Sequence, residues 1–155
     1  MAATVLPYQT RQRLAASAAF AFLAMAGTAV ALGVAMLWPR TWERASSVQQ
    51  LRSGTPQLLM IAGQEIYLLW ENGAPLALST RDPHGPYGSG CQNPRVRYDA
   101  ASARFIDPCG GATYERNGSY VRGPSPRSLD RFPVRVNAGQ VEIDAGEIIP
   151  GKAHF

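Results

Sequence analysis

The hydrophobic and polar positions of this chain follow two different patterns, one before and one after about residue 54. From residue 14 to residue 38, 25 consecutive residues carry no charge. A helix of this length spans roughly 37 Å at about 1.5 Å per residue, which exceeds the about 30 Å of a bilayer's hydrocarbon core. The pattern predicts a transmembrane helix over residues 14–38, a tail over residues 1–13 and a polar linker over residues 39–54.

The flanks of the apolar segment indicate its orientation. Arg11 and Arg13 precede it, which favours a cytoplasmic N-terminus. A cleaved signal peptide is the alternative, but the apolar region of such a peptide has only about 7–15 residues. We therefore expect a single-pass membrane anchor, with the rest of the chain on the periplasmic or extracellular side.

The anchor is rich in small residues, including Gly27, Ala29 and Gly33. Small faces let helices approach closely inside a bilayer, so these residues predict packing against helices of other membrane subunits. An alanine-rich genome would give the same bias.

After residue 54 the pattern changes to short apolar or alternating runs separated by turn residues. The expected strands are residues 57–62, 65–70, 75–79, 95–98, 103–106, 113–116, 119–122, 132–137 and 140–144. Asn72-Gly73, Asn117-Gly118 and Ala138-Gly139 separate three pairs of them, which is typical of hairpins. This spacing predicts an all-β antiparallel sandwich or barrel over residues 55–155, ending in a short tail.

Charge narrows the function classes. The net charge is +4, but the basic residues are scattered and no run of five occurs. No nucleic-acid-binding motif is present, so we expect no nucleic-acid partner. A basic exterior would suit an acidic partner, such as a soluble electron carrier.

Two short segments resemble the cluster-binding loops of Rieske proteins. They are residues 82–84 (Asp-Pro-His) and 107–111 (Asp-Pro-Cys-Gly-Gly), and residues 66–69, 77–79, 96–99 and 123–127 extend the resemblance over about residues 55–144. In that family, a Cys-x-His box and a Cys-Pro-Cys-His-Gly box hold a [2Fe–2S] cluster through two Cys and two His. The resemblance implies a Rieske-type antiparallel β-sandwich.

The same alignment implies that the cluster ligands have been lost. Asp82 and Asp107 stand at the two ligand Cys positions, Gly110 stands at one ligand His position, and only His84 matches. Six residues separate His84 from Cys91 where the family has two. Aligning backward from Cys91 would place Pro86 and Gly88 at the first box, which is equally defective. We expect no bound cofactor.

The resemblance places Cys91 and Cys109 at the positions of the family's disulfide. Two Cys in an exported domain also suit one disulfide, whereas their spacing matches no zinc motif. The closed loop would have 19 residues (91 to 109) and would stabilise the fold by about 3 kcal/mol.

Asp82, His84 and Asp107 leave two interpretations open. Two carboxylates and an imidazole could hold Zn²⁺, Mn²⁺ or Fe²⁺. Alternatively, each Asp precedes a Pro and caps its own loop by accepting backbone N–H bonds. No nucleophile motif accompanies His84, so we expect no catalytic residue. Tyr87, in the loop that follows, is either a partner anchor or an ordinary loop aromatic.

These observations lead to three hypotheses of function. The preferred one is a cluster-free, non-enzymatic accessory subunit of a respiratory or photosynthetic electron-transfer complex in the membrane. The second is an active electron-transfer subunit with an atypical metal at Asp82, His84 and Asp107. The third is an envelope binding or scaffold protein outside bioenergetics.

Overall fold

The computed structural model describes residues 40–85 and 95–154. The chain divides into two compact units, Met1–Pro39 and Arg40–Phe155. The expected anchor over residues 14–38, with Gly27, Ala29 and Gly33, lies outside the described residues, and so do Tyr87 and Cys91. Within residues 40–85 and 95–154, no helix has the length and apolar character needed to cross a membrane.

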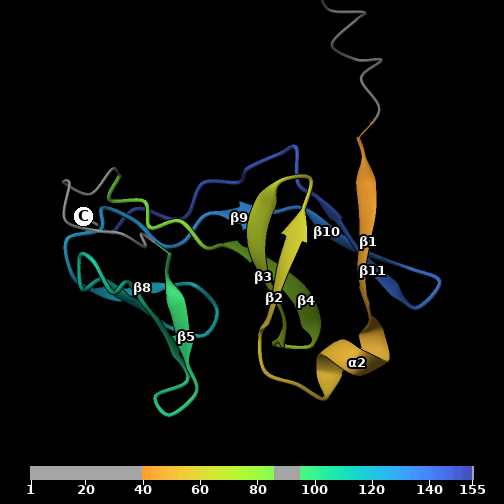
Figure 1. Ribbon diagram of the computed structural model, residues 1–155, viewed down its shortest axis with the longest axis horizontal. Helices are drawn as coiled ribbons and strands as arrows, with labels where there is room; N and C mark the ends of the chain where they lie inside the picture. The colour runs from red at the N-terminus through yellow and green to blue at the C-terminus, as the bar shows by residue number, and fades with distance from the viewer. Residues whose placement is uncertain (1–39, 86–94, 155) are drawn as a thin grey trace, which may run out of the picture. The chain divides into compact units, whose positions relative to one another are not determined.

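The second unit is built of short antiparallel strands and one described helix, α2 (Val48–Arg52). The strands are β1 (Trp42–Ser47), β2 (Gln57–Ile61), β3 (Gln64–Glu71), β4 (Ala74–Ser79), β5 (Arg97–Asp99), β6 (Arg104–Ile106), β7 (Thr113–Tyr114), β8 (Tyr120–Arg122), β9 (Arg131–Phe132), β10 (Val134–Asn137) and β11 (Gln140–Asp144). They form three sheets, in the orders β1-β11-β10, β2-β3-β4-β9 and β5-β6-β7-β8 (Figure 1). The expectation of an antiparallel all-β domain is confirmed.

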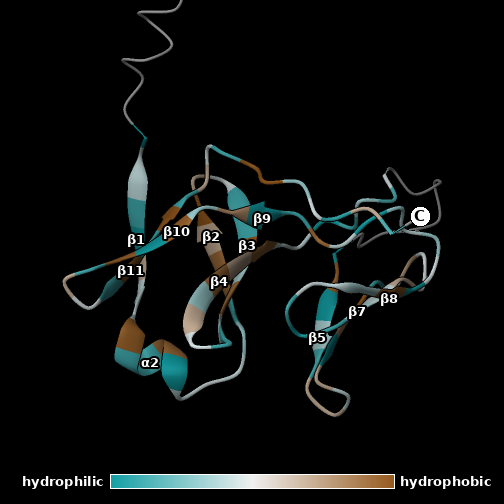
Figure 2. Cartoon of the chain, turned by 180° about the vertical axis from the view of Figure 1, so that it is seen from behind, coloured by the Kyte–Doolittle hydropathy of each residue, from teal (hydrophilic) through white to brown (hydrophobic). Residues whose placement is uncertain are grey.

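Two hydrophobic cores hold these sheets together, and strand β3 contributes to both. Ile66 and Leu68 pack into the core shared with β1-β11-β10 and helix α2. Tyr67 and Leu69 point the other way, into the core that contains Phe105 and the rest of the β5–β8 sheet. Successive side chains of a strand face opposite sides, so β3 is covered on both faces. Figure 2 shows its hydrophobic colouring alongside that of β4.

Tight turns set the register of the hairpins. Asn72 and Gly73 both have positive φ, at 51° and 84°, and Ala138 and Gly139 follow the same pattern at 47° and 76°. Two consecutive positive φ angles are typical of the type I′ turn, whose twist matches that of paired strands. The resulting pairs Glu71–Ala74 and Asn137–Gln140 close β3-β4 and β10-β11 as the sequence predicts.

The expectation of a linker over residues 39–54 is wrong. Strand β1 pairs with β11, and Ser47 caps helix α2 by accepting the Gln50 N–H at 3.2 Å. Leu51, on that helix, is fully buried in the first core. Leu51, with Ala45 and Val48 packed against the same core, anchors a mostly polar segment, so its composition resembles that of a linker although its backbone is paired.

Replacing Leu51 tests whether this segment belongs to the folded domain. Leu51→Ala removes a fully buried side chain, so we expect a loss of about 2–5 kcal/mol in the free energy of unfolding. Leu58→Ala is the matched control, because Leu58 is 48% exposed and its loss should cost much less. Chemical denaturation of the full-length chain measures both. Equal effects would mean that residues 40–54 do not contribute to the core.

Candidate functional site

Two loops bring the predicted site residues together at one end of the domain. The first leaves β4, and the pairing Val96 N–H to Thr80 C=O at 2.8 Å fixes where it begins. The second joins β6 to β7, and Asp107 N–H bonds to Ala112 C=O at 2.8 Å across its base. Asp82 and Asp107 therefore sit at the roots of their loops, where the paired strands end.

Asp82 caps the first loop. Asp82 is only 6% exposed, and its Oδ1 accepts a hydrogen bond from the backbone N–H of His84 at 2.7 Å. This is the contact of an Asx-turn, in which a carboxylate bonds to the backbone two residues later. Oδ2 is also buried, and it has no hydrogen-bond partner of ordinary geometry among the described atoms.

Asp107 caps the second loop more completely. It is 1% exposed, Oδ1 accepts the Cys109 N–H at 3.0 Å and Oδ2 accepts the Gly110 N–H at 2.6 Å. Its backbone carbonyl also accepts the Gly111 N–H at 3.0 Å. The interpretation of both aspartates as loop caps is confirmed.

Tyr114, which the sequence analysis did not single out, places a phenol in the same region. The residue is fully buried, and no hydrogen bond of ordinary geometry satisfies its hydroxyl among the residues described. Burial raises the pKa of the phenol; nearby Ser125 opposes this shift, and the charges of Asp82 and Asp107 add to it. We call Asp82, Asp107, Tyr114 and Ser125 the buried polar centre.

The loop over residues 123–127 closes this centre from a third side. Ser125 is 1% exposed and donates its hydroxyl proton to the carbonyl of Arg127 at 3.1 Å. Gly123, with φ of 110°, lies so close to the second loop that a Cβ would be 2.5 Å from the Ala112 Cα. Only glycine fits there, which explains in physical terms the Gly-Pro start of this loop.

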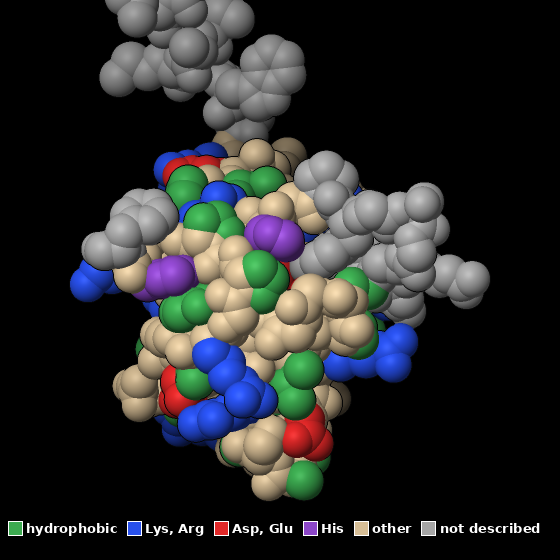
Figure 3. Space-filling view, turned by 90° about the vertical axis from the view of Figure 1, so that its left-hand side faces the viewer, with side chains coloured by type: hydrophobic (Ala, Val, Ile, Leu, Met, Phe, Trp, Pro, Cys, Tyr) green, Lys and Arg blue, Asp and Glu red, His purple; other side chains and the backbone are tan. Residues whose placement is uncertain are grey.

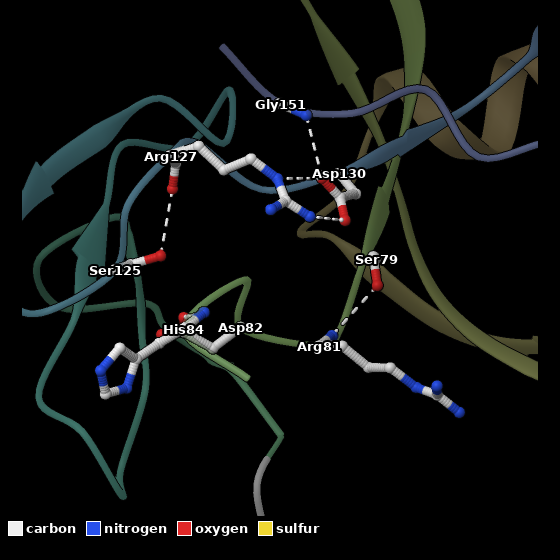
Figure 4. Close-up of polar contacts among 8 residues, drawn as sticks. All are labelled: Ser79, Arg81, Asp82, His84, Ser125, Arg127, Asp130 and Gly151. Carbon is white, nitrogen blue, oxygen red and sulfur yellow. Dashed lines mark hydrogen bonds and ion pairs between the residues drawn. The ribbon is translucent and has the colours of Figure 1, made fainter. Parts of the chain in front are cut away.

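An ion pair anchors the same loop to the β2-β3-β4-β9 sheet. Arg127 makes two hydrogen bonds to the Asp130 carboxylate, at 3.0 and 2.9 Å (Figure 4). The backbone carbonyl of Asp130 accepts the Ser79 N–H at 2.8 Å. The Asp130 side chain also accepts the Gly151 N–H at 2.9 Å. Arg127 is a local partner, three residues before Asp130, but Ser79 and Gly151 are distant along the chain, so this role of Asp130 could not be predicted from local sequence.

The described residues do not gather a metal site. His84 is exposed, while Asp82 and Asp107 turn oxygens toward the backbone of their own loops. No group of three or more His, Cys, Asp or Glu within residues 40–85 and 95–154 is arranged to hold a metal ion. The hypothesis of an atypical metal at Asp82, His84 and Asp107 is therefore not favoured.

Of the two cysteines, only Cys109 lies within the described residues. Cys109 is half-buried and is not a free thiol. Cys91 lies outside the described residues, so the Cys91–Cys109 pairing stays a prediction.

Comparison with known proteins finds relatives that match part of the chain. No family model matches the chain. The cytochrome b6-f complex iron-sulfur subunit of Prochlorococcus marinus strain MIT 9515 is 48% identical over 48 residues, which are 31% of this chain and 27% of the relative. The corresponding subunit of Chlorobaculum tepidum is 25% identical over 91 residues, which are 59% of this chain and 46% of the relative. Over these parts of its length, the chain is similar to Rieske iron-sulfur subunits.

One solved structure is similar to this chain at the level of the fold. The cyanobacterial plasma membrane Rieske protein PetC3 from Synechocystis PCC 6803 aligns with a TM-score of 0.53 at 17% identity, covering 66% of this chain and 99% of that one. The chain spans about a quarter to a half of the length of the two curated relatives described above. The solved structure therefore supports a shared Rieske fold. The partial coverage does not carry the activity of the full-length relatives over to this chain.

The cap made by Asp107 can be tested by substitution. Asp107→Ala leaves two partly buried N–H groups without acceptors, so we expect a loss of about 2–5 kcal/mol in unfolding free energy, and a smaller loss for Asp107→Asn. Asp99 also accepts bonds from two following residues, but at an exposed turn. Asp99→Ala should therefore cost clearly less in the same denaturation experiment. A comparable loss for the two alanine variants would contradict the capping role.

The raised pKa of Tyr114 predicts how stability depends on alkaline pH. The unfolded phenol loses its proton near pH 10, whereas the folded phenol keeps it, so unfolding releases a proton above about pH 10. The stabilising contribution is complete below that pH and falls by up to about 1.4 kcal/mol per pH unit above it. Tyr114→Phe should remove this loss of stability at alkaline pH, whereas the control Tyr98→Phe should retain it. The free energy of unfolding, measured by chemical denaturation below and above about pH 10, tests both variants. If the unfolding free energy of Tyr114→Phe fell with pH as steeply as that of the unchanged chain, this prediction would be wrong.

Proposed function

We propose that the chain is a cluster-free accessory subunit of a membrane-bound electron-transfer complex, with a structural and non-catalytic role. The observation that carries this proposal is the capping geometry of Asp82 and Asp107. In the resemblance described above, Asp82 and Asp107 stand at the positions of the family's ligand cysteines, and both bond to the backbone of their own loops. Each carboxylate therefore caps the beginning of its own loop.

The residues present do not fit a [2Fe–2S] cluster. Such a cluster needs four donors, thiolates or thiolates with imidazoles. Of the four positions that the family uses, His84 alone offers a suitable donor, since the others are Asp82, Asp107 and Gly110. Cys109 is not a free thiol either. We therefore assign no electron-transfer step to this site.

The family relationship supports the choice of complex. The curated relatives are named as iron-sulfur subunits of cytochrome b6-f complexes, and the fold neighbour as a plasma membrane Rieske protein. We propose that this chain retains association with integral membrane subunits of such a complex while having lost the cofactor. In this proposal, residues 14–38 are the anchor, the β-domain is outside the cytoplasm, and Cys91 and Cys109 form a disulfide.

Metal and sulfide analysis tests the loss of the cofactor. Full-length protein purified anaerobically from membranes should contain no stoichiometric iron or acid-labile sulfide, and no Rieske-type signal after reduction in low-temperature electron paramagnetic resonance. A cytochrome b6-f iron-sulfur subunit prepared in the same way is the positive control. One cluster per chain would refute the proposal.

Copurification tests the accessory role independently. Extraction in mild detergent should recover the chain together with haem-containing integral membrane subunits. Gly33→Phe should lower the amount of that complex by pushing a neighbouring helix away. His84→Ala should leave both assembly and turnover per complex unchanged. Recovery without any redox subunit would instead support an envelope scaffold, and turnover lost in a fully assembled His84→Ala complex would support a redox role.

A further inference from the structure

The C-terminal segment, residues 146–154, forms one wall of a cleft that the sequence analysis did not anticipate. The cleft has a volume of about 630 Å³, and its opposite wall comes from β8 and the start of β9. Its lining includes Tyr120, Ser128, Arg131, Ile149, Lys152 and His154. This volume falls within the range of about 300–1,000 Å³ that is usual for small-molecule sites.

Backbone pairing holds the C-terminal wall in place. Arg131 and Ile149 exchange two backbone hydrogen bonds at 2.8 Å, and the Ser128 N–H bonds to the Lys152 carbonyl at 2.9 Å. Gly151 lies so close to Ser128 that an added Cβ would be 2.0 Å from the Ser128 carbonyl oxygen. Because its walls are already fixed, this cleft can bind a ligand without the entropic cost of ordering a flexible segment.

The His154 side chain holds the end of the C-terminal segment against the domain. The His154 imidazole stacks on the Tyr120 ring, with centroids 3.6 Å apart and planes 6° from parallel. Its Nε2 lies 2.5 Å from the Ser125 carbonyl oxygen. The cleft wall therefore contacts the same loop that closes the buried polar centre.

The charge of the cleft is one-sided. Arg131, Lys152 and His154 line it, and no Asp or Glu among the described residues does. Asp130, the neighbouring acid in sequence, is already bound by Arg127 and by the Gly151 N–H. Over residues 40–85 and 95–154, no carboxylate lies within ion-pair distance of Arg131 or Lys152. Figure 3 views this end of the domain and shows basic and histidine side chains at its surface.

We propose that this cleft binds a small organic anion through a carboxylate or phosphate group. Arg131 is half-buried, and one guanidinium nitrogen donates to the Asn117 carbonyl at 3.1 Å, which holds the side chain in place. A guanidinium presents further N–H groups in a fixed fork that matches such oxyanions. Lys152 adds a second charge, while Ile149 and the Tyr120 ring provide apolar surface for the ligand's carbon skeleton.

Titration with two defined anions tests the proposal. Citrate and inorganic phosphate are titrated separately, by isothermal calorimetry, into the full-length chain in neutral detergent at constant ionic strength set with chloride. We expect saturable 1:1 binding of at least one of them in the micromolar to millimolar range. Arg131→Gln should weaken binding about tenfold or more, since a charge-assisted hydrogen bond is lost.

Two further variants separate binding from folding and from net charge. Lys152→Gln changes an exposed side chain, so it should weaken binding without altering the thermal unfolding temperature. Arg122→Gln removes the same charge at an exposed position outside the cleft lining, and it should bind as the unchanged chain does. Absence of saturable binding by both anions, or equal weakening by Arg122→Gln and Lys152→Gln, would overturn the proposal. The anion-binding proposal does not depend on the proposed accessory role, and the outcome of one experiment does not decide the other.

Discussion

Burial of strand β3 on both faces is the constraint on which the rest of this domain depends. Ile66 and Leu68 fill one core while Tyr67 and Leu69 fill the other. A strand covered on only one side would bury half of this apolar surface, and burial is the dominant favourable term in folding. The β1-β11-β10 sheet with helix α2, and the β5–β8 sheet, are therefore both required, one for each face of β3.

The carboxylates of the two site loops lie outside both cores. Neither Asp82 nor Asp107 belongs to a core cluster, and the second loop contributes only Ala112. The loops instead depend on local polar contacts, because a buried N–H without an acceptor costs about 1–3 kcal/mol, more than the about 0.5–1.5 kcal/mol that an ordinary hydrogen bond contributes. A carboxylate can meet that demand at a loop root just as a metal-bound thiolate would, provided that it is held at the turn. Asp107, with one N–H bonded to each oxygen, meets it fully.

Much of the fold could be predicted from the sequence because its signals are local. The turn Asn72-Gly73 fixes the register of the paired strands around it, and Asp-Pro at residues 107–108 indicates a capped loop. Strand β1 and the C-terminal wall of the cleft could not be predicted, because their partners, β11 and residues 127–131, are distant in sequence. Tyr114 was missed for a similar reason: a tyrosine in a short strand looks like ordinary core until its hydroxyl is placed beside Asp82.

The loop of residues 123–127 connects the two polar features of the domain. On one side, Ser125 lies in the buried polar centre beside Tyr114. On the other, its carbonyl contacts His154, and Arg127 binds Asp130, which in turn holds the Gly151 N–H. Because Gly123 leaves no space against Ala112, this loop cannot shift without disturbing the second site loop. The loop over residues 123–127 is therefore shared between the buried polar centre and the C-terminal wall of the cleft.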